Sequence, residues 1–439
     1  MSVITSDIDL KEKIVQAFEQ TPDRKNVQRT EALHHFQKLG LPGNKTEEYR
    51  FVSITRALEK NFSFDQLNPI ESNIKSIDEF LIPDLEANII VFINGIYSPD
   101  FSKVISPESE ITISDLRKAV NQSEAPVYFE KYLKAFVDPF TALNAALWQD
   151  GIFIQIPART KVEKPVFILH INDAEKSQSI CHTRLLVVLE EGSELTLIER
   201  SASVGTNNIF HTFAEEIVVK ENASLDYVKI QNDEGKLHQV ANSMIHQSNK
   251  SKLNTFTLTL NGSLIRNNFN IAIDGENCES HFYGLYVLNG NTIADNHTVV
   301  DHIKPNSFSN ELYKGVMDGN SKGVFNGKIF VRPNAQKTNA FQSNRNILLT
   351  DTATINTKPQ LEIWADDVKC SHGCTSGQLD EEALFYLRSR GIPLETAKAM
   401  LLYAFAAETL EPIKNAELKS YLNSLISQRL TTDGRKLDS

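Results

Sequence analysis

Residues 184–199 read RLLVVLEEGSELTLIE, two apolar runs separated by the small-residue turn Gly192-Ser193. Short runs rich in Val, Ile and Leu and bounded by turn residues are typical of β-strands. From about Gly151 the chain continues in the same way, with IFIQIP, PVFILHI, EEIVVKENASLDYVKI, KLNTFTLTLNGS and NFNIAI. No helical periodicity appears in this part of the sequence, so it is predicted to be all β.

The turns between these runs recur at a nearly constant distance. They fall at Gly192-Ser193, Asn222-Ala223, Asn249-Lys250, Glu276-Asn277, Pro305-Asn306 and Pro333-Asn334. The second residues of successive pairs are 30, 27, 27, 29 and 28 positions apart. A fixed period of this size indicates a solenoid or a propeller, and propeller blades need about 40–50 residues. The sequence therefore predicts a mainly β fold, a parallel β-helix, with a large β-sandwich as the structural alternative.

The part before this repeat is predicted to be mainly helical with short strands. Leu10, Ile14 and Phe18 repeat with the spacing of one helical face, and a second helical run ends at Gly40. NIIVFINGIYS indicates a strand followed by a tight turn, and PFTALNAALWQDG indicates a short helix. We therefore expect three regions: residues 1–150 mainly helical, residues 151–375 the β-helix core, and residues 376–439 a C-terminal helical domain.

Helix signals support the last of these regions. In LDEEALFYLRSRG, Asp380 is placed as the N-cap, acidic residues fill the first turn, and Gly391 follows the end. The next helical stretch, residues 397–407, is apolar apart from Lys398. A helix that is apolar nearly all round is either buried or docked on a partner.

Composition excludes several classes of protein. The net charge is −11, and no basic run longer than a pair is present, which argues against nucleic-acid binding. The first twenty residues, MSVITSDIDLKEKIVQAFEQ, lack the apolar core of a signal peptide, and no stretch of the chain approaches the length of a membrane span. Four scattered cysteines do not make a disulfide framework, so we expect free thiols in a reducing cytoplasm.

The segment VKCSHGCTSG places Cys370, His372 and Cys374 within five residues. Thiolate and imidazole ligands suit zinc, copper(I) and iron–sulfur clusters. If a β-strand continues through Cys370 and His372, both side chains face the same way, whereas Gly373 and the following helix are expected to turn Cys374 away. Two ligands cannot complete a four-coordinate site, so the pattern indicates either a site that another chain completes or a labile site. A reactive cysteine and a merely structural corner are the alternatives.

The run from Tyr313 to Pro393, which includes KCSHGCTSGQLDEEALFYLRSRGIP, resembles the SufB/SufD family of iron–sulfur cluster assembly scaffolds. DNHTVVDH at residues 295–302 and GLPGNKTEEYRF at residues 40–51 fit the same family. The CSHG segment matches the SufD subgroup, because SufB proteins carry Glu-His-Glu-Ala there. The resemblance spans both ends of the chain.

This resemblance implies a right-handed parallel β-helix between two helical regions, which agrees with the pattern of the residues. It implies a non-catalytic subunit of a SufB–SufC–SufD complex that pairs with SufB through the β-helix and docks the SufC ATPase through its C-terminal helices. Of the apolar residues there, Leu401, Leu402 and Phe405 are the expected contacts. A homodimer of the isolated chain and a flavin in the complex are compatible with the family, and no motif of the sequence addresses either.

The family resemblance also assigns the ligands. His372 is the implied ligand of a transient iron–sulfur cluster shared with SufB, with Cys370 beside it. Family members often have Ala in place of Cys374, so the role of this thiol stays open. Two competing functions are a secreted type of β-helix enzyme acting on polysaccharides and a stable zinc-binding module. The sequence contains no GxxxxGK[ST] motif, so no ATP hydrolysis by this chain is expected.

Overall fold

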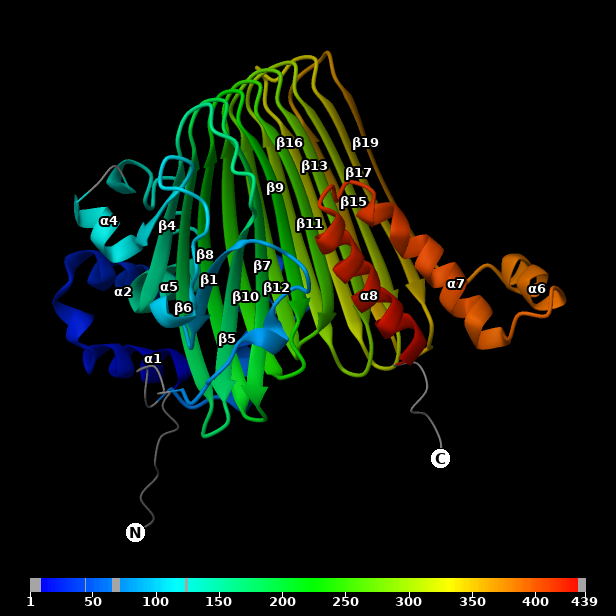
Figure 1. Ribbon diagram of the computed structural model, residues 1–439, viewed down its shortest axis with the longest axis horizontal. Coiled ribbons are helices and arrows are strands. Elements are labelled where there is room, and N and C mark those ends of the chain that lie inside the picture. Colours follow the sequence, from blue (N-terminus) through cyan, green and yellow to red (C-terminus); the bar gives the residue numbers. More distant parts are fainter. Residues whose placement is uncertain (1–8, 44, 65–71, 123–124, 433–439) are drawn as a thin grey trace, which may run out of the picture.

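The computed structural model describes residues 9–43, 45–64, 72–122 and 125–432. Its centre is a parallel β-helix whose coils stack side by side and whose strands form two long sheets (Figure 1). Sheet A contains, in chain order, β1 (Asn88–Ile93), β2 (Ile96–Tyr97), β5 (Val166–Ala174), β7 (Glu194–Gly205), β9 (Ser224–Asn232), β11 (Lys252–Asn261), β13 (Glu279–Leu288), β15 (Phe308–Met317), β17 (Asn339–Leu348) and β19 (Lys369–Gly377). Sheet B contains β3 (Thr112–Asp115), β4 (Asp150–Ile156), β6 (Ser179–Leu189), β8 (Asn208–Val219), β10 (Lys236–Gln247), β12 (Leu264–Ile273), β14 (Ile293–His302), β16 (Lys322–Val331) and β18 (Thr354–Ile363). The predicted fold class is confirmed.

Each coil contributes one strand to each sheet, and one corner of the coil carries a residue with positive φ. These residues are Arg159, Gly192, Asn222, Lys250, Asn277, Asn306 and Lys337. They stack: the amide of Gly192 donates to the carbonyl of Glu221, and the amide of Asn222 donates to that of Asn249. The predicted turn at Pro333-Asn334 is confirmed, and a second turn in the same corner contains Lys337, the left-handed residue of that coil.

The strands are apolar along their whole length because both of their faces are covered. In β6, Leu185 and Val187 face the interior of the β-helix, whereas Leu186 and Val188 pack against helices outside it. Strands buried on both faces lose the alternation of apolar and polar residues. This explains the continuous run LLVVL in the stretch 184–199.

Helices of the N-terminal region cover the outer face of sheet B. They are α1 (Leu10–Glu19), α2 (Val27–Leu39), α3 (Ile54–Asn61), α4 (Leu116–Gln122) and α5 (Pro139–Leu147). The α5 helix begins at Asp138, whose carboxylate accepts from the amides of Phe140 and Thr141. Phe140 packs in one apolar cluster with Phe210 of sheet B. The family-matching segment at residues 40–51 lies in this region, except for Asn44, which lies outside the described residues.

The N-terminal region also closes one end of the β-helix. Strand β1 pairs in parallel with β5 and forms a hairpin with β2, and β3 pairs antiparallel with β4. The predicted strand and turn in NIIVFINGIYS are therefore confirmed, and this strand belongs to the sheet of the solenoid. The first coil is thus capped by antiparallel strands and helices.

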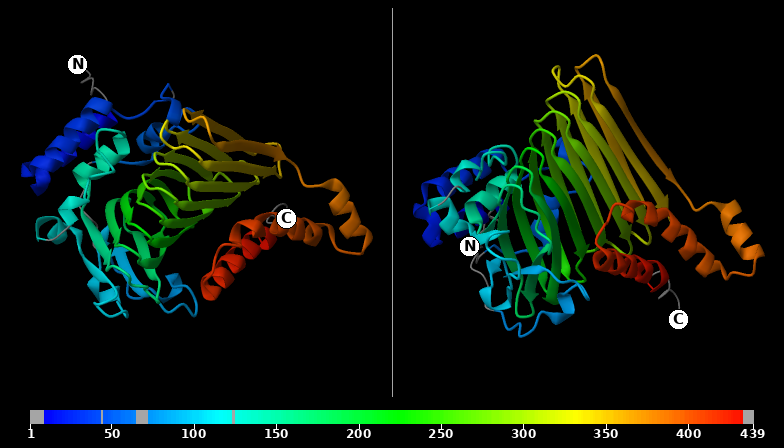
Figure 2. Two further views of the ribbon diagram at one scale, coloured as in Figure 1. Left: turned by 90° about the horizontal axis from the view of Figure 1, so that it is seen from above. Right: turned by 45° about the horizontal axis from the view of Figure 1, so that its top comes forward.

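The C-terminal helices α6 (Glu381–Ser389), α7 (Leu394–Ala407) and α8 (Ala416–Thr432) lie outside sheet A. Asp380 caps α6 by accepting from the amides of Glu382 and Ala383, as predicted. The α7–α8 hairpin runs along the sheet, whereas α6 and the start of α7 extend beyond the body of the molecule (Figures 1 and 2). Lys314 of β15 fastens α7, because its ammonium group donates to the carbonyl of Phe405 at 2.7 Å.

Within the described ranges, no helix has the length and hydropathy that a membrane span requires.

Candidate functional site

The segment KCSHGCTSG forms β19, the last strand of sheet A. It pairs with β17 in the register Cys370 with Ala340, His372 with Gln342 and Cys374 with Asn344. Neighbours in a parallel sheet point to the same face, and the three β17 partners are buried, which identifies the inward face.

All three candidate ligands therefore face the interior side of the β-helix. The expectation that Gly373 turns Cys374 away is wrong. The strand runs on to Gly377, so Cys374 keeps the alternation and shares a face with Cys370 and His372. Consecutive members of the trio are about 7 Å apart along the strand.

This inward face is open because the chain forms no further coil in its described part. Strand β18 pairs with β16 and β19 with β17, so each of these last two strands has a free edge. Cys370 is half-buried and packs against the interior apolar cluster, whereas His372 and Cys374 are exposed. Burial raises the pKa of the Cys370 thiol above its usual value.

The trio is not a preformed metal site. Within residues 9–43, 45–64, 72–122 and 125–432, no three His, Cys, Asp or Glu side chains are grouped so that they could hold a metal ion. A stable zinc module needs four converging ligands, typically Cys or His. The geometry instead offers a row of donors along the free end of the solenoid.

The other two cysteines are buried members of the β-helix. Cys181 is 0% exposed and Cys278 is 2% exposed. Burial raises the pKa of Cys181 to about 12, so its thiol stays protonated at neutral pH. Both fit the interpretation of isolated cysteines as small core residues.

Beneath the trio lies a layer of amides on β17. Gln342 donates from Nε2 to the buried carboxyl of Glu311 at 2.6 Å. Asn344 and Asn346 form a hydrogen-bonded set with the hydroxyl of Tyr286. The interior therefore becomes polar as it approaches the open end.

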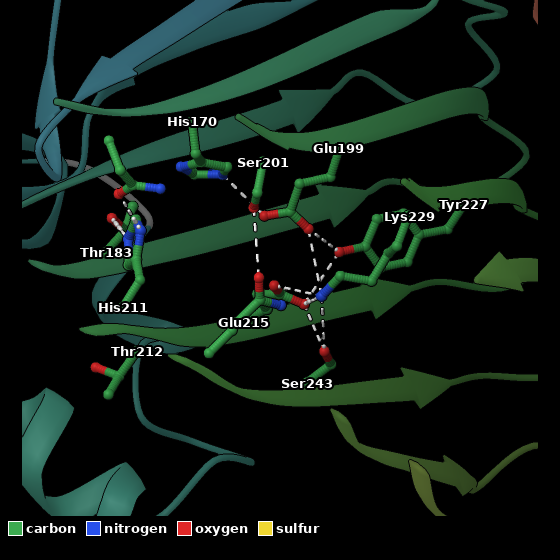
Figure 3. A network of polar contacts seen from close by, with 12 residues as sticks. His170, Thr183, Glu199, Ser201, His211, Thr212, Glu215, Tyr227, Lys229 and Ser243 are labelled. Carbon is green, nitrogen blue, oxygen red and sulfur yellow. Dashed lines mark hydrogen bonds and ion pairs between the residues drawn. The ribbon is translucent and has the colours of Figure 1, made fainter. Parts of the chain in front are cut away.

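A second polar network lies deep inside the first coils, where Figure 3 shows its side chains converging between the two sheets. The ammonium group of Lys229 lies 2.6 Å from Glu215 and 3.3 Å from Glu199. Tyr227 donates to Glu199 at 2.6 Å, and His170 Nε2 lies 2.9 Å from Glu199. This network was not predicted from the sequence, although charged residues inside apolar strands such as TFAEEIVV are a sign of it.

The carboxyl groups of this network differ in protonation. Burial, together with the charge of Glu199, raises the pKa of Glu215 to about 7. Burial also acts on Glu199, but the charge of Lys229 and the hydrogen bond with His170 outweigh it and hold the pKa of Glu199 below its usual value. Each side chain is at most 6% exposed. The network is therefore an internal support of the fold and offers no surface to a substrate.

The C-terminal residues expected to contact a partner differ in exposure. Leu402 is 4% exposed and belongs to the cluster between the helices and sheet A. Leu401 and Phe405 are half-buried, and the Phe405 ring lies 4.6 Å from the ammonium group of Lys314. The exposed apolar side chains of this region are Phe385 and Tyr386 of α6 and Met400 of α7.

Two models of known protein families match this chain. Residues 170–405 match the model described as "SUF system FeS cluster assembly, SufBD core domain". Residues 8–168 match the model "SufBD protein N-terminal region". The chain belongs to the SufBD family. The core-domain match includes the trio on β19 and most of α7.

Relatives within the SufBD family extend over nearly the whole chain. An iron–sulfur cluster assembly SufBD family protein of Synechocystis is 32% identical, covering 89% of this chain and 88% of its own length. The iron–sulfur cluster assembly protein SufD of Escherichia coli is 30% identical, covering 95% and 96%. The chloroplastic protein ABCI7 of Arabidopsis thaliana is 28% identical, covering 86% and 80%. The resemblance seen in the sequence is thus confirmed: this SufBD protein is a SufD homologue of the SUF system.

Proposed function

We propose that this SufBD protein is a non-catalytic scaffold subunit on which an iron–sulfur cluster is assembled. The observation that carries the proposal is the incomplete row of donors, Cys370, His372 and Cys374, on the open end of the solenoid. The cluster is cargo here, and His372 is its proposed ligand, with Cys370 beside it. A neutral imidazole offers one ring nitrogen to iron, and a second subunit would supply the remaining ligands.

The partner at this end is proposed to be a SufB subunit. The free edges of β18 and β19 present unpaired backbone groups, which favour addition of strands from another chain. Pairing there would cover the inward face and enclose the donors of β19. A partner that is itself a β-helix would continue both sheets across the junction.

The C-terminal helices are proposed to dock an ATPase of the SufC type. Phe385 and Tyr386 expose apolar surface on α6, which extends beyond the solenoid, and Met400 exposes apolar surface on α7. A hollow of about 360 Å³ between α7 and α8 borders Met400 and Tyr403. Because Leu402 is buried, its proposed contribution is to hold α7 in place, and the contact itself falls to the exposed residues.

The energy for assembly would then come from the ATPase partner, since this chain has no phosphate-binding GxxxxGK[ST] loop. The proposed location is the cytoplasm. The chloroplastic relative indicates that members of the family work in more than one compartment.

The test is anaerobic purification of the complex formed with SufB and SufC partners, carrying wild-type or His372→Ala protein. We expect His372→Ala to lose most of the iron and acid-labile sulfide while complex formation survives. The folded chain should lose no more than about 1 kcal/mol of stability, because the ring is exposed. Cys370→Ser should show an equal or milder loss, and Cys374→Ala the smallest.

The matched control is His281→Ala, because His281 lies on β13 with its ring stacked on Tyr283, outside the interior. Normal iron and sulfide content in the His372→Ala complex, together with full complementation of a strain lacking the gene, would reject the ligand role.

A further inference from the structure

The three side chains on β19 rest on different neighbours. Beneath Cys370 is Ala340, which offers no polar group. Beneath Cys374 is Asn344, whose amide nitrogen donates to the hydroxyl of Tyr286 at 3.1 Å and to a carbonyl at 3.2 Å. Its oxygen accepts from Asn346 at 2.7 Å. Neither position gives its β19 neighbour an unused hydrogen-bonding group.

Gln342, the neighbour of His372, is different. It is 3% exposed, its Nε2 donates to Glu311 at 2.6 Å, and its Oε1 is buried without a hydrogen-bond partner. A buried acceptor without a donor costs about 1–3 kcal/mol, so its presence calls for a reason. With its nitrogen facing the carboxyl group of Glu311, the amide of Gln342 directs its oxygen away from that group.

The side chain of Gln342 belongs to a row of residues in register that reaches the open end of the β-helix. Glu311, Gln342 and His372 are successive partners in the register of β15, β17 and β19. Neighbouring strands are about 4.8 Å apart, so the next side chain outward from the amide on this face is the imidazole of His372. A neutral imidazole carries one N–H donor, which is the group that Oε1 lacks.

Sheet B, on the opposite side of the interior, leaves room for the amide of Gln342. Gly327 of sheet B lies so close that a Cβ placed on it would come within 2.3 Å of Gln342 Nε2. A larger residue at this position would displace the amide. The glycine therefore leaves the space in which the Gln342 side chain is held.

We propose that Gln342 is a positioning residue for His372 and that Glu311 orients Gln342 from behind. The structure does not contain this bond, since Oε1 has no partner; a rotation of the exposed His372 ring would bring its N–H to Oε1 of Gln342. That hydrogen bond would select one neutral tautomer and leave the other ring nitrogen with its lone pair free at the open end. Histidines that bind metals are generally held by such a second hydrogen bond. This inference rests on the proposed function and adds the group that prepares the ligand.

The first test needs no cluster. In the full-length chain labelled with ¹⁵N-histidine, at pH 8, the ring nitrogen shifts of His372 should report mainly one tautomer, with His372→Ala providing the assignment. Gln342→Met, which keeps the length of the side chain but removes the acceptor, should bring the two tautomers closer to their free ratio. Glu311→Gln, which still offers an acceptor to the Gln342 amide, should preserve the wild-type ratio.

Asn326→Leu is the matched control. Like Gln342, Asn326 is buried, at 2% exposed, and its amide oxygen lacks a hydrogen-bond partner. It differs in belonging to sheet B, where it lines the cleft beneath the N-terminal region. This variant should leave the His372 signals unchanged. An unchanged tautomer ratio in Gln342→Met would overturn the inference.

The second test uses the complex with SufB and SufC partners. Gln342→Met should lower iron and labile sulfide per complex several-fold, approaching His372→Ala. Gly327→Ala retains all hydrogen-bonding groups but displaces the Gln342 amide, so it should also lower the iron and sulfide content. This variant takes the place of Gln342→Met if Gln342→Met does not fold. Normal loading in both variants, alongside loss in His372→Ala, would refute the positioning role and leave the proposed function intact. Normal loading in His372→Ala would instead refute the proposed function.

Discussion

Glu311 is a carboxyl group enclosed by the β-helix, with 1% of its surface exposed. Burial raises its pKa from 4.5 to about 7, although the hydrogen bond from Gln342 acts against this. The folded chain therefore holds this proton more tightly than the unfolded chain does. The stability that it contributes is complete below about pH 4.5 and is lost as the pH rises through 7.

We expect Glu311→Gln to flatten this pH dependence. Between pH 4 and pH 8 the wild-type free energy of unfolding should fall by up to about 3 kcal/mol relative to the variant. Urea unfolding at a series of pH values measures this difference. Parallel profiles for the two proteins would show that Glu311 ionises normally in the folded state.

The stability of the fold should also depend on the cation of the network around Lys229. Lys229→Met leaves Glu199 and Glu215 buried without their cation, which should cost about 3–5 kcal/mol of stability. Replacing all three residues by apolar ones of similar size should restore much of that loss. Lys161→Met is the control, because its ion pair with Glu163 is exposed and should have no measurable effect. Denaturant midpoints compare the variants, and equal midpoints for Lys229→Met and wild type would contradict the expectation.

At the level of single residues, the sequence predicted part of the candidate site. Alternation along a strand was enough to place Cys370 and His372 on one face. The position of Cys374 depended on how far β19 pairs with β17, which is a contact between segments about thirty residues apart and is invisible in local patterns. The partnership of Lys229 with Glu215 likewise follows from the register between strands.

The C-terminal helices present apolar residues where no part of the described chain covers them. Phe385→Glu and Met400→Glu should each weaken binding of the proposed SufC-type ATPase partner at least tenfold, because burying an unpaired carboxylate in an apolar contact costs more than about 1.4 kcal/mol. Calorimetric titration of the purified partner into this chain measures the affinity.

Val27→Glu is the control for these variants, since Val27 is 80% exposed on α2, on the other side of the molecule. Unchanged affinity in both helix variants, with normal circular dichroism, would exclude this surface. Leu402→Glu is unsuitable as a test, because a charge at this buried position would disturb the packing of α7 itself.

The coil is the element that the sequence predicted best. A period of 27–30 residues, measured between turn residues, was sufficient to indicate the solenoid. The corner at Pro333-Asn334 contains more than the predicted turn. Pro and Asn favour the turn that forms there. The left-handed residue that stacks on the next coil is Lys337, whose amide donates to the carbonyl of Asp367.

For the whole molecule, the division of the interior into apolar and polar parts is compatible with the proposed scaffold role. The charged groups found inside the first coils are sealed from solvent, and the donors at the open end are incomplete. We expect the purified chain by itself to hydrolyse neither ATP nor polysaccharides. Phosphate release and reducing-sugar assays test this directly, and turnover that copurifies with the chain and is lost on mutation of His372 or Lys229 would contradict it.

The overall architecture could be predicted because it repeats, whereas the asymmetry of its two ends could not. Strands β1 and β3 reach the solenoid from the N-terminal region and pair with β5 and β4. Nothing in NIIVFINGIYS distinguishes a strand that caps a β-helix from one in a separate small sheet. That distinction depends on contacts with residues about 75 positions later.

The capped end of the β-helix is also synthesised before the open end. Protein synthesis proceeds from the N-terminus, so the cap and the first coils leave the ribosome before the last strand is translated. Each later coil can add to a finished template, and nascent chains stalled after β12 should already resist protease over residues 150–240. The segment that carries His372 is made late, and a chain that terminates before β19 would lack both the site and the α7–α8 cover of sheet A.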